Sequence, residues 1–111
     1  MVMPDVVLGE FEQLVLLSLT RLGPDAYGVP IAEDISERTG RDVSLGAVYK
    51  TLERLEDKGL VASRIGEPTP ERGGRRKKHY RLATVGQRAL RQSMTALRNM
   101  TDGLESELKL P

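Results

Sequence analysis

The strongest concentration of charge in the sequence is a basic segment of ten residues, 72–81. Six of them are cationic: Arg72, Arg75, Arg76, Lys77, Lys78 and Arg81. Prolines and glycines over 68–74 predict a loop between two strands, over 60–66 and 77–82. Long basic side chains on such a hairpin can neutralise phosphates and release the counterions condensed on nucleic acid. The segment therefore predicts phosphate contacts, with a merely solvated surface loop as the alternative interpretation.

A second candidate is the start of a predicted helix that opens at Ser44. Ser44, Gly46 and Ala47 are small, so the backbone can come close to a phosphate that the helix dipole attracts. Tyr49 and Lys50 follow with hydrogen-bonding groups of longer reach. The major groove of DNA is about 12 Å wide and admits such a helix, whose N-terminal residues then meet base edges. An ordinary amphipathic helix with a solvated face remains the alternative.

No combination of residues in the sequence predicts an enzyme. The chain has no cysteine and a single histidine, which excludes a thiolate zinc site and a cysteine nucleophile. No Gly-rich phosphate loop follows a strand, and no carboxylate pair or Ser/His/Asp set can be argued. His79 is interpreted as a surface residue of a strand or as a phosphate contact. We therefore predict no catalytic residue, no metal site and no cofactor.

Three predicted helices position these two groups. Apolar residues spaced three and four apart predict helices over 8–22, 29–39 and 44–59. The buried face of the third consists of Leu45, Val48, Leu52 and Leu55. Its opposite face then carries Gly46 and Lys50. The second and third helices, joined by a short turn, match a helix-turn-helix, and with the hairpin they form a winged helix over 1–83.

The rest of the chain, 84–111, predicts a fourth helix that carries an apolar stripe. Thr84 and Gln87 have the spacing of a capping box at its start. A heptad seam follows, formed by Leu90, Met94, Leu97, Thr101, Leu104 and Leu108. A helix with such a stripe must bury it against another surface. The stripe predicts a dimerisation helix in a homodimer, and packing of this helix on its own domain is the alternative.

Composition sets outer limits on these predictions. The 111 residues carry a net charge of only +1. Residues 1–60 are nevertheless acidic on balance and residues 61–83 are basic, so the positive charge is concentrated in one short segment. The longest apolar run, Leu14 to Leu17, is far shorter than the ~20 residues of a membrane span. The first residues lack the pattern of a signal peptide. We expect a cytoplasmic protein with no membrane partner.

Several motifs together resemble the PadR family of transcriptional regulators, over roughly residues 8–90. The most specific is S-x-G-x-V-Y-x-x-L-x-R-L-E-x-x-G-L, over 44–60. Supporting matches are Leu14–Leu19, Tyr27-Gly28 before Ile31, Arg81-Leu82, and Thr84 with Gly86. The resemblance implies a winged helix-turn-helix with a C-terminal dimerisation helix, and repression by operator binding. It also implies that Tyr27 contacts a phosphate.

Some relatives in this family bind planar aromatic compounds between their subunits through tryptophan on the last helix. This chain has no tryptophan, so an effector of unidentified chemistry stays an open alternative. Met94 and Met100 are the adaptable apolar side chains that could line such a pocket.

The combined prediction is an α+β, mainly helical, winged helix-turn-helix protein that regulates transcription as a homodimer on double-stranded DNA. The expected output is repression from a palindromic operator, with the third helix in the major groove. The predicted wing lies on the backbone or in the minor groove. The DNA-binding residues are Tyr27, Ser44, Gly46, Tyr49, Lys50, Arg75, Arg76, Lys77 and Lys78. The alternative function is a winged-helix adapter that holds an acidic protein partner.

Overall fold

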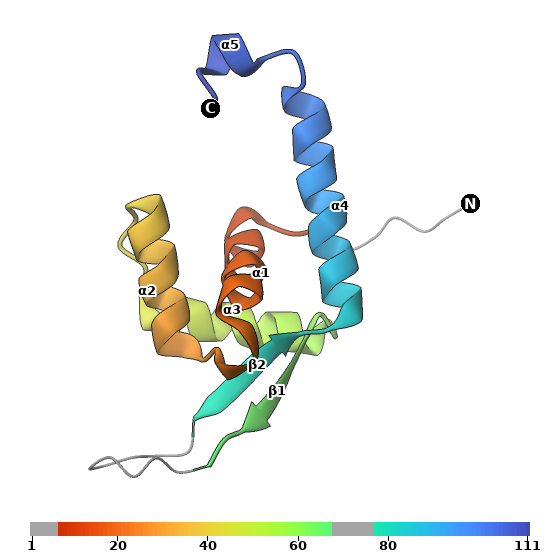
Figure 1. Ribbon diagram of the computed structural model, residues 1–111. Helices are drawn as coiled ribbons and strands as arrows, with labels where there is room; N and C mark the ends of the chain where they lie inside the picture. Colours follow the sequence, from red (N-terminus) through yellow and green to blue (C-terminus); the bar gives the residue numbers. More distant parts are fainter. Residues whose placement is uncertain (1–6, 68–76) are drawn as a thin grey trace.

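The computed structural model describes residues 7–67 and 77–111, and Figure 1 shows a helical body with one small antiparallel sheet. Its elements in chain order are α1 (Glu10–Leu22), the 3-10 turn η1 (Gly23–Asp25), α2 (Gly28–Thr39), α3 (Leu45–Asp57), β1 (Val61–Ile65), β2 (Lys78–Leu82), α4 (Thr84–Thr101) and α5 (Glu105–Leu108). The mainly helical α+β class predicted from the sequence is confirmed.

The second and third helices form the predicted helix-turn-helix. Gly40 ends α2 with φ 73°, a left-handed conformation that glycine adopts without strain. Four residues later, the Ser44 hydroxyl accepts a hydrogen bond from the Ala47 N–H at 3.1 Å. This side-chain cap satisfies one of the free donors at the start of α3. The predicted N-cap is therefore confirmed.

The hairpin is fastened to the helices along its length. Val61 pairs with Leu82 at its base, and Ile65 pairs with Lys78 toward its tip. Tyr80 also donates its backbone N–H to the carbonyl of Ala26 at 2.9 Å, so β2 is bound on its other edge to the segment before α2. A side chain at Gly86 would collide with the carbonyl oxygen of Leu60. The first turn of α4, which packs on Leu60, therefore requires glycine at that position.

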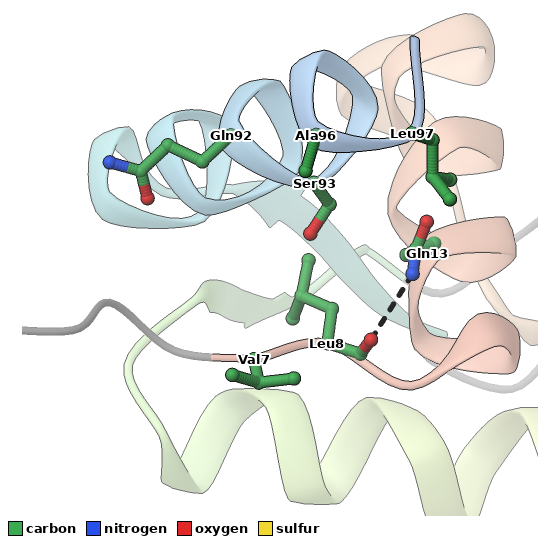
Figure 2. A pocket seen from close by; sticks show the side chains of 7 residues that line it. All are labelled: Val7, Leu8, Gln13, Gln92, Ser93, Ala96 and Leu97. Carbon is green, nitrogen blue, oxygen red and sulfur yellow. Dashed lines mark hydrogen bonds between the residues drawn. The ribbon is translucent and has the colours of Figure 1, made fainter. Parts of the chain in front are cut away.

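Helix α4 leaves the body and leaves part of its apolar stripe uncovered. Figure 2 shows the groove between its middle and the segment that precedes α1. The groove has a volume of about 480 Å³, and α4 contributes Gln92, Ser93, Ala96 and Leu97 to its wall. On the facing side, the Gln13 amide donates to the carbonyl of Leu8 at 3.1 Å.

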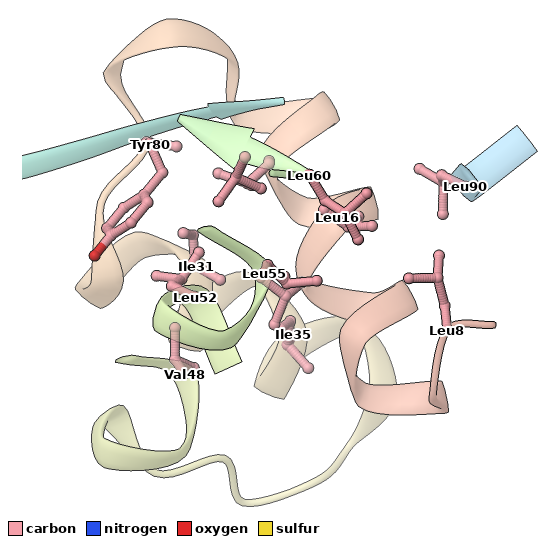
Figure 3. Packing of buried hydrophobic residues seen from close by; sticks show 14 of the residues in the cluster. Leu8, Leu16, Ile31, Ile35, Val48, Leu52, Leu55, Leu60, Tyr80 and Leu90 are labelled. Atoms are coloured by element: carbon pink, nitrogen blue, oxygen red, sulfur yellow. The ribbon is translucent and has the colours of Figure 1, made fainter. Parts of the chain in front are cut away.

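The core lies where α1, α2, α3 and the hairpin meet, as Figure 3 shows. Its largest fully buried side chains are Leu16, Ile31, Leu52, Leu55 and Leu60. Tyr80 of β2 closes one side of this cluster and Leu90 of α4 closes the other. Burial of each large aliphatic side chain contributes roughly 1.5–3 kcal/mol. Helix α3 and the hairpin are therefore both packed against one continuous apolar core.

Two predictions about helix faces and helix ends were wrong. Leu45 was predicted to be buried but is 40% exposed, and Thr51 is buried on that side of α3 instead. Leu45 is the first residue of α3, at the edge of the core, whereas Thr51 lies on the arc between Val48 and Leu55. Thr84 and Gln87 form no capping box, because Ala83 is the N-cap residue and has no capping side chain.

The predicted seam is also not one continuous helix. Helix α4 ends at Thr101, and Gly103 with φ 83° turns the chain before α5. Leu104 and Leu108 therefore belong to a separate short segment, which Figure 1 shows standing clear of the three-helix body. Periodicity alone could not reveal this break, because the 3- and 4-residue steps continue across it.

Candidate nucleic-acid interface

The outward face of α3 is an open surface of small and polar residues. Ser44, Gly46, Ala47, Lys50 and Glu53 line a shallow depression there. Apart from its two chain neighbours and the backbone of α3 itself, no atom of the described residues lies within 4 Å of the position that a Cβ on Gly46 would take, so this side of the helix is open. A shallow surface of this kind suits a large ligand better than a small molecule, because small-molecule sites are concave and mostly apolar.

Tyr49 is held against the start of α2. A Cβ added to Gly28 would lie 2.7 Å from the Tyr49 hydroxyl oxygen and from Cε1, well inside van der Waals contact. The ring can occupy this place only because residue 28 has no side chain. The residue as a whole is 37% exposed, so part of the ring reaches the surface. Tyr49 therefore packs on the start of α2 and also contributes to the surface of α3.

Tyr27, the residue before Gly28, connects the same region to the hairpin. The Lys77 ammonium lies 5.2 Å from the centre of the Tyr27 ring, within cation–π range. His79 meets the other part of that ring edge-on, at 5.7 Å between centroids. The dipeptide Tyr27-Gly28 thus contacts α3 through Gly28 and the tip-side end of β2 through Tyr27.

The tip-side end of the two strands is attached to η1 by a second set of contacts. Arg64 of β1 pairs with the Asp25 carboxylate at 3.3 Å. The His79 Nδ1 lies 3.1 Å from the Asp25 carbonyl oxygen, so this nitrogen must carry the proton that it donates. The hairpin therefore has a defined direction relative to α2 and α3.

Lys78 is placed differently from Lys77. Its ammonium pairs with Glu56 of α3 at 3.3 Å and lies 5.5 Å from the ring centre of Tyr80. The hydrogen bond with Glu56 raises the pKa of Lys78. The hydroxyl of Ser63 also donates to Glu56 and lowers the pKa of that carboxyl. Lys78 thus joins the hairpin to α3 while part of its charge is neutralised.

A buried carboxylate attaches the far end of α3 to α1. Glu12 accepts hydrogen bonds from the Lys58 ammonium at 3.0 Å and from the Gly9 N–H at 2.9 Å. Arg54 approaches the same carboxylate at 3.5 Å. Burial raises the pKa of Glu12, but these donors outweigh it, so the pKa lies below its ordinary value of 4.5. These contacts orient α3 without using its outward face.

Comparison with known proteins identifies the family. The sequence model of the transcriptional regulator PadR-like family matches residues 15–92. The chain belongs to this family. A PadR family transcription regulator from hypervirulent Clostridium difficile R20291 is 28% identical, with a TM-score of 0.74 over 90% of this chain and 99% of that one. A PadR family regulator from Eggerthella lenta DSM 2243 is also 28% identical, with a TM-score of 0.66 over 92% and 88%. No curated protein matches the sequence.

Family membership confirms the resemblance drawn from the motifs, and with it a role in DNA-binding regulation of transcription. The PadR-like fold brings Tyr27, Tyr49 and Lys77 to one region, around Gly28. Ser44, Gly46 and Lys50 line the neighbouring surface of α3. The remaining predicted contacts, Arg75 and Arg76, lie outside the described residues.

Sequence reasoning missed two features of this PadR-like site. The role of Glu12 was not foreseen, although an acidic residue three positions after Gly9 is a recognisable signal for a helix start. The packing of Tyr49 on Gly28 was also missed. In the part of the chain that the structure describes, no cluster of three His, Asp or Glu side chains could hold a metal ion. None of the described helices combines the length and hydropathy needed to cross a membrane.

Proposed function

We propose that this PadR-like regulator is a homodimeric repressor that binds a palindromic DNA operator. The observation that carries the proposal is the meeting of α3 and the hairpin at Tyr27-Gly28. Tyr49 packs on Gly28, and Lys77 lies over the ring of Tyr27. A helix with an accessible start and a cation of the wing thus face one side of the molecule, which is the arrangement that a duplex can contact in two grooves at once.

In this proposal α3 enters the major groove and the wing contacts the backbone or the minor groove. Ser44, Gly46, Tyr49 and Lys50 approach base edges and nearby phosphates from α3. Tyr27, Arg75, Arg76, Lys77 and Lys78 supply phosphate contacts. Phosphate contacts contribute affinity for any sequence, and base contacts contribute specificity. The wing therefore sets the salt dependence, and α3 sets the preferred operator.

The homodimer accounts for the uncovered part of the apolar stripe. Leu90 is buried and Met94 is packed within the same chain, so these two side chains support the fold as well. Leu97 is 53% exposed and Met100 is 75% exposed. Thr101 ends α4, and Leu104 and Leu108 of the separate C-terminal segment are also exposed. A second copy that covers this surface would bury several large apolar side chains. Two-fold symmetry then predicts half-sites about 34 Å apart, or a multiple of that spacing.

Selection of bound duplexes from a random pool, using the full chain, tests the operator prediction. The expected product is an inverted repeat with the half-site spacing given above. The absence of any enriched sequence would contradict sequence-specific binding. In vitro transcription from a promoter that contains the selected operator should decrease when the protein is added, and an increase would contradict repression.

Titration with random duplex DNA at low salt separates this function from that of a protein adapter. A DNA regulator binds such duplexes with a Kd of roughly 1–100 μM, and log K falls with log salt by about 0.9 per phosphate contacted. An adapter for an acidic protein need not bind them. Membership of the PadR-like family favours binding to random duplexes. Substitution of Lys77 by Gln should lower the slope of log K against log salt by about 0.9, the value for one phosphate contact, without changing the selected operator.

A further inference from the structure

The surface proposed to read bases contains a carboxylate as well as a cation. Gly46, Lys50 and Glu53 follow one another at intervals of four and three residues on α3. They share the face opposite Val48, Leu52 and Leu55, which are fully buried. Glu53 also lines the same depression as Gly46 and Lys50. Any duplex that contacts Lys50 therefore comes close to a negative charge.

No ion pair or hydrogen bond among the described residues uses this charge. The other glutamate of α3, Glu56, is bound by Ser63 and Lys78, and Arg54 approaches Glu12 of α1. Within residues 7–67 and 77–111, neither Lys50 nor Glu53 takes part in an ion pair or side-chain hydrogen bond. Two opposite charges three residues apart on a helix are close enough to pair. Both side chains are instead available to a ligand.

A free carboxylate between two rows of phosphates is repelled unless it accepts a hydrogen bond. Two base edges in the major groove offer an amino donor, cytosine through N4 and adenine through N6. Adenine places the N7 acceptor beside its amino group, and this lone pair repels a carboxylate. Cytosine has no such neighbouring acceptor. The chemistry of Glu53 therefore favours cytosine.

We propose that Glu53 determines specificity by selecting a cytosine in each operator half-site, and that Lys50 reads a guanine of a neighbouring base pair. Three residues of helix rise by about 4.5 Å, which is close to the ~3.4 Å between base pairs. Lysine suits the O6 and N7 acceptors of guanine. This inference rests on the proposed function, because it needs α3 in the major groove.

The test compares duplex selection by the wild-type chain, Glu53→Gln, Glu53→Ala and the control Glu107→Gln. Glutamine binds adenine through two hydrogen bonds, so Glu53→Gln should change one preferred cytosine to adenine in each half-site. Glu53→Ala should leave that position without a preference. Glu107 is an exposed residue of α5, so the same charge change there should leave the selected operator unchanged.

Affinities measured on the wild-type operator give the size of the effect. The loss for Glu53→Gln should be roughly 5- to 150-fold, as for one good base contact. Binding of Glu53→Gln to random duplexes should instead become tighter, because a repulsive charge is removed. The melting temperature should not change for this exposed side chain, which separates a binding effect from misfolding.

Three outcomes would overturn the inference. If both Glu53 variants select the same consensus as the wild-type chain, the inference about Glu53 is refuted, but the proposed function is not. Equal weakening of Glu53→Gln on every duplex would also refute it, because a structural residue behaves in that way. A wild-type chain that selects no sequence would refute both the inference and the proposed function.

Discussion

Substitution of Gly28 by Ala should disturb DNA binding through Tyr49, with little effect on stability. The new Cβ would lie 2.7 Å from the Tyr49 hydroxyl oxygen and from Cε1, whereas ordinary contacts begin near 3.4 Å. Cζ of the ring would lie closer still, so the ring must move by about 1 Å. Because Tyr49 is partly exposed, it can turn toward solvent instead of straining the core.

The expected cost in stability is small for two reasons. Overpacking costs about 1–3 kcal/mol in a tight core. Because the Tyr49 ring is partly exposed and can move, the cost of Gly28→Ala should lie near the lower value. Alanine is also a better helix former than glycine by up to ~1 kcal/mol, and residue 28 is the first residue of α2. We expect the free energy of unfolding to fall by no more than about 1 kcal/mol.

The expected cost in DNA binding is larger. A hydrogen bond from the Tyr49 hydroxyl to a charged phosphate contributes about 1.5–3 kcal/mol, so its loss should weaken operator binding by roughly 10- to 150-fold. Fluorescence anisotropy with a labelled operator measures this loss, and chemical denaturation measures the stability of the same samples.

A double-mutant cycle assigns the effect to the ring. Tyr49→Ala should weaken binding about as much as Gly28→Ala does. Adding Gly28→Ala to Tyr49→Ala should then change the affinity by less than about twofold, because the collision no longer exists. Additive losses in the double variant, or an unchanged affinity for Gly28→Ala, would refute the reasoning.

Three further predictions follow from other contacts. Gly46→Ala should stabilise α3 by about 0.5–1 kcal/mol, since no described residue outside its own helix comes within 4 Å of the new methyl. It should nevertheless weaken operator binding; tighter or equal binding would show that DNA does not approach this backbone. Leu97→Asp should convert the dimer to a monomer in size-exclusion chromatography with light scattering, while Asn99→Asp, on the opposite side of α4, should not; a dimer in both variants would place the interface elsewhere. Glu12 has a folded-state pKa below its ordinary value of 4.5, so its stabilisation is present above that value and is lost as the pH falls through the folded-state pKa. Stability of the wild-type chain should therefore decline below about pH 5, and Glu12→Gln should reduce this dependence; identical pH profiles would refute the role of the carboxylate.

Features that depend on neighbouring residues along the chain were predictable from the sequence. The spacing of apolar residues located the three helices of the body, and Ser44 was identified as the cap of α3. The alternation around Tyr80 located the second strand. Each of these features arises from local backbone hydrogen bonding or from a single buried face, which a short stretch of sequence records.

Features that join distant parts of the chain were not predictable in this way. The contact between Gly28 and Tyr49, and the binding of Lys58 by Glu12, link residues on different helices. Leu45 has the spacing of a buried residue but lies beyond the edge of the core. Whether a side chain is covered depends on the packing of other elements, and one sequence alone contains no record of that packing.

In α3, the residues that hold the helix in place are different from those on its outward face, and this separation has a consequence for how operators and regulators diversify. The contacts that set the pose of the helix pass through Tyr49, Arg54 and Lys58, whereas positions 46, 50 and 53 point away from them. If these three positions read bases as proposed, duplicated copies of such a gene can acquire new operators by substitution at them without loss of the packing that holds α3. For the same reason, an engineer who wishes to retarget the molecule can randomise them as an independent cassette.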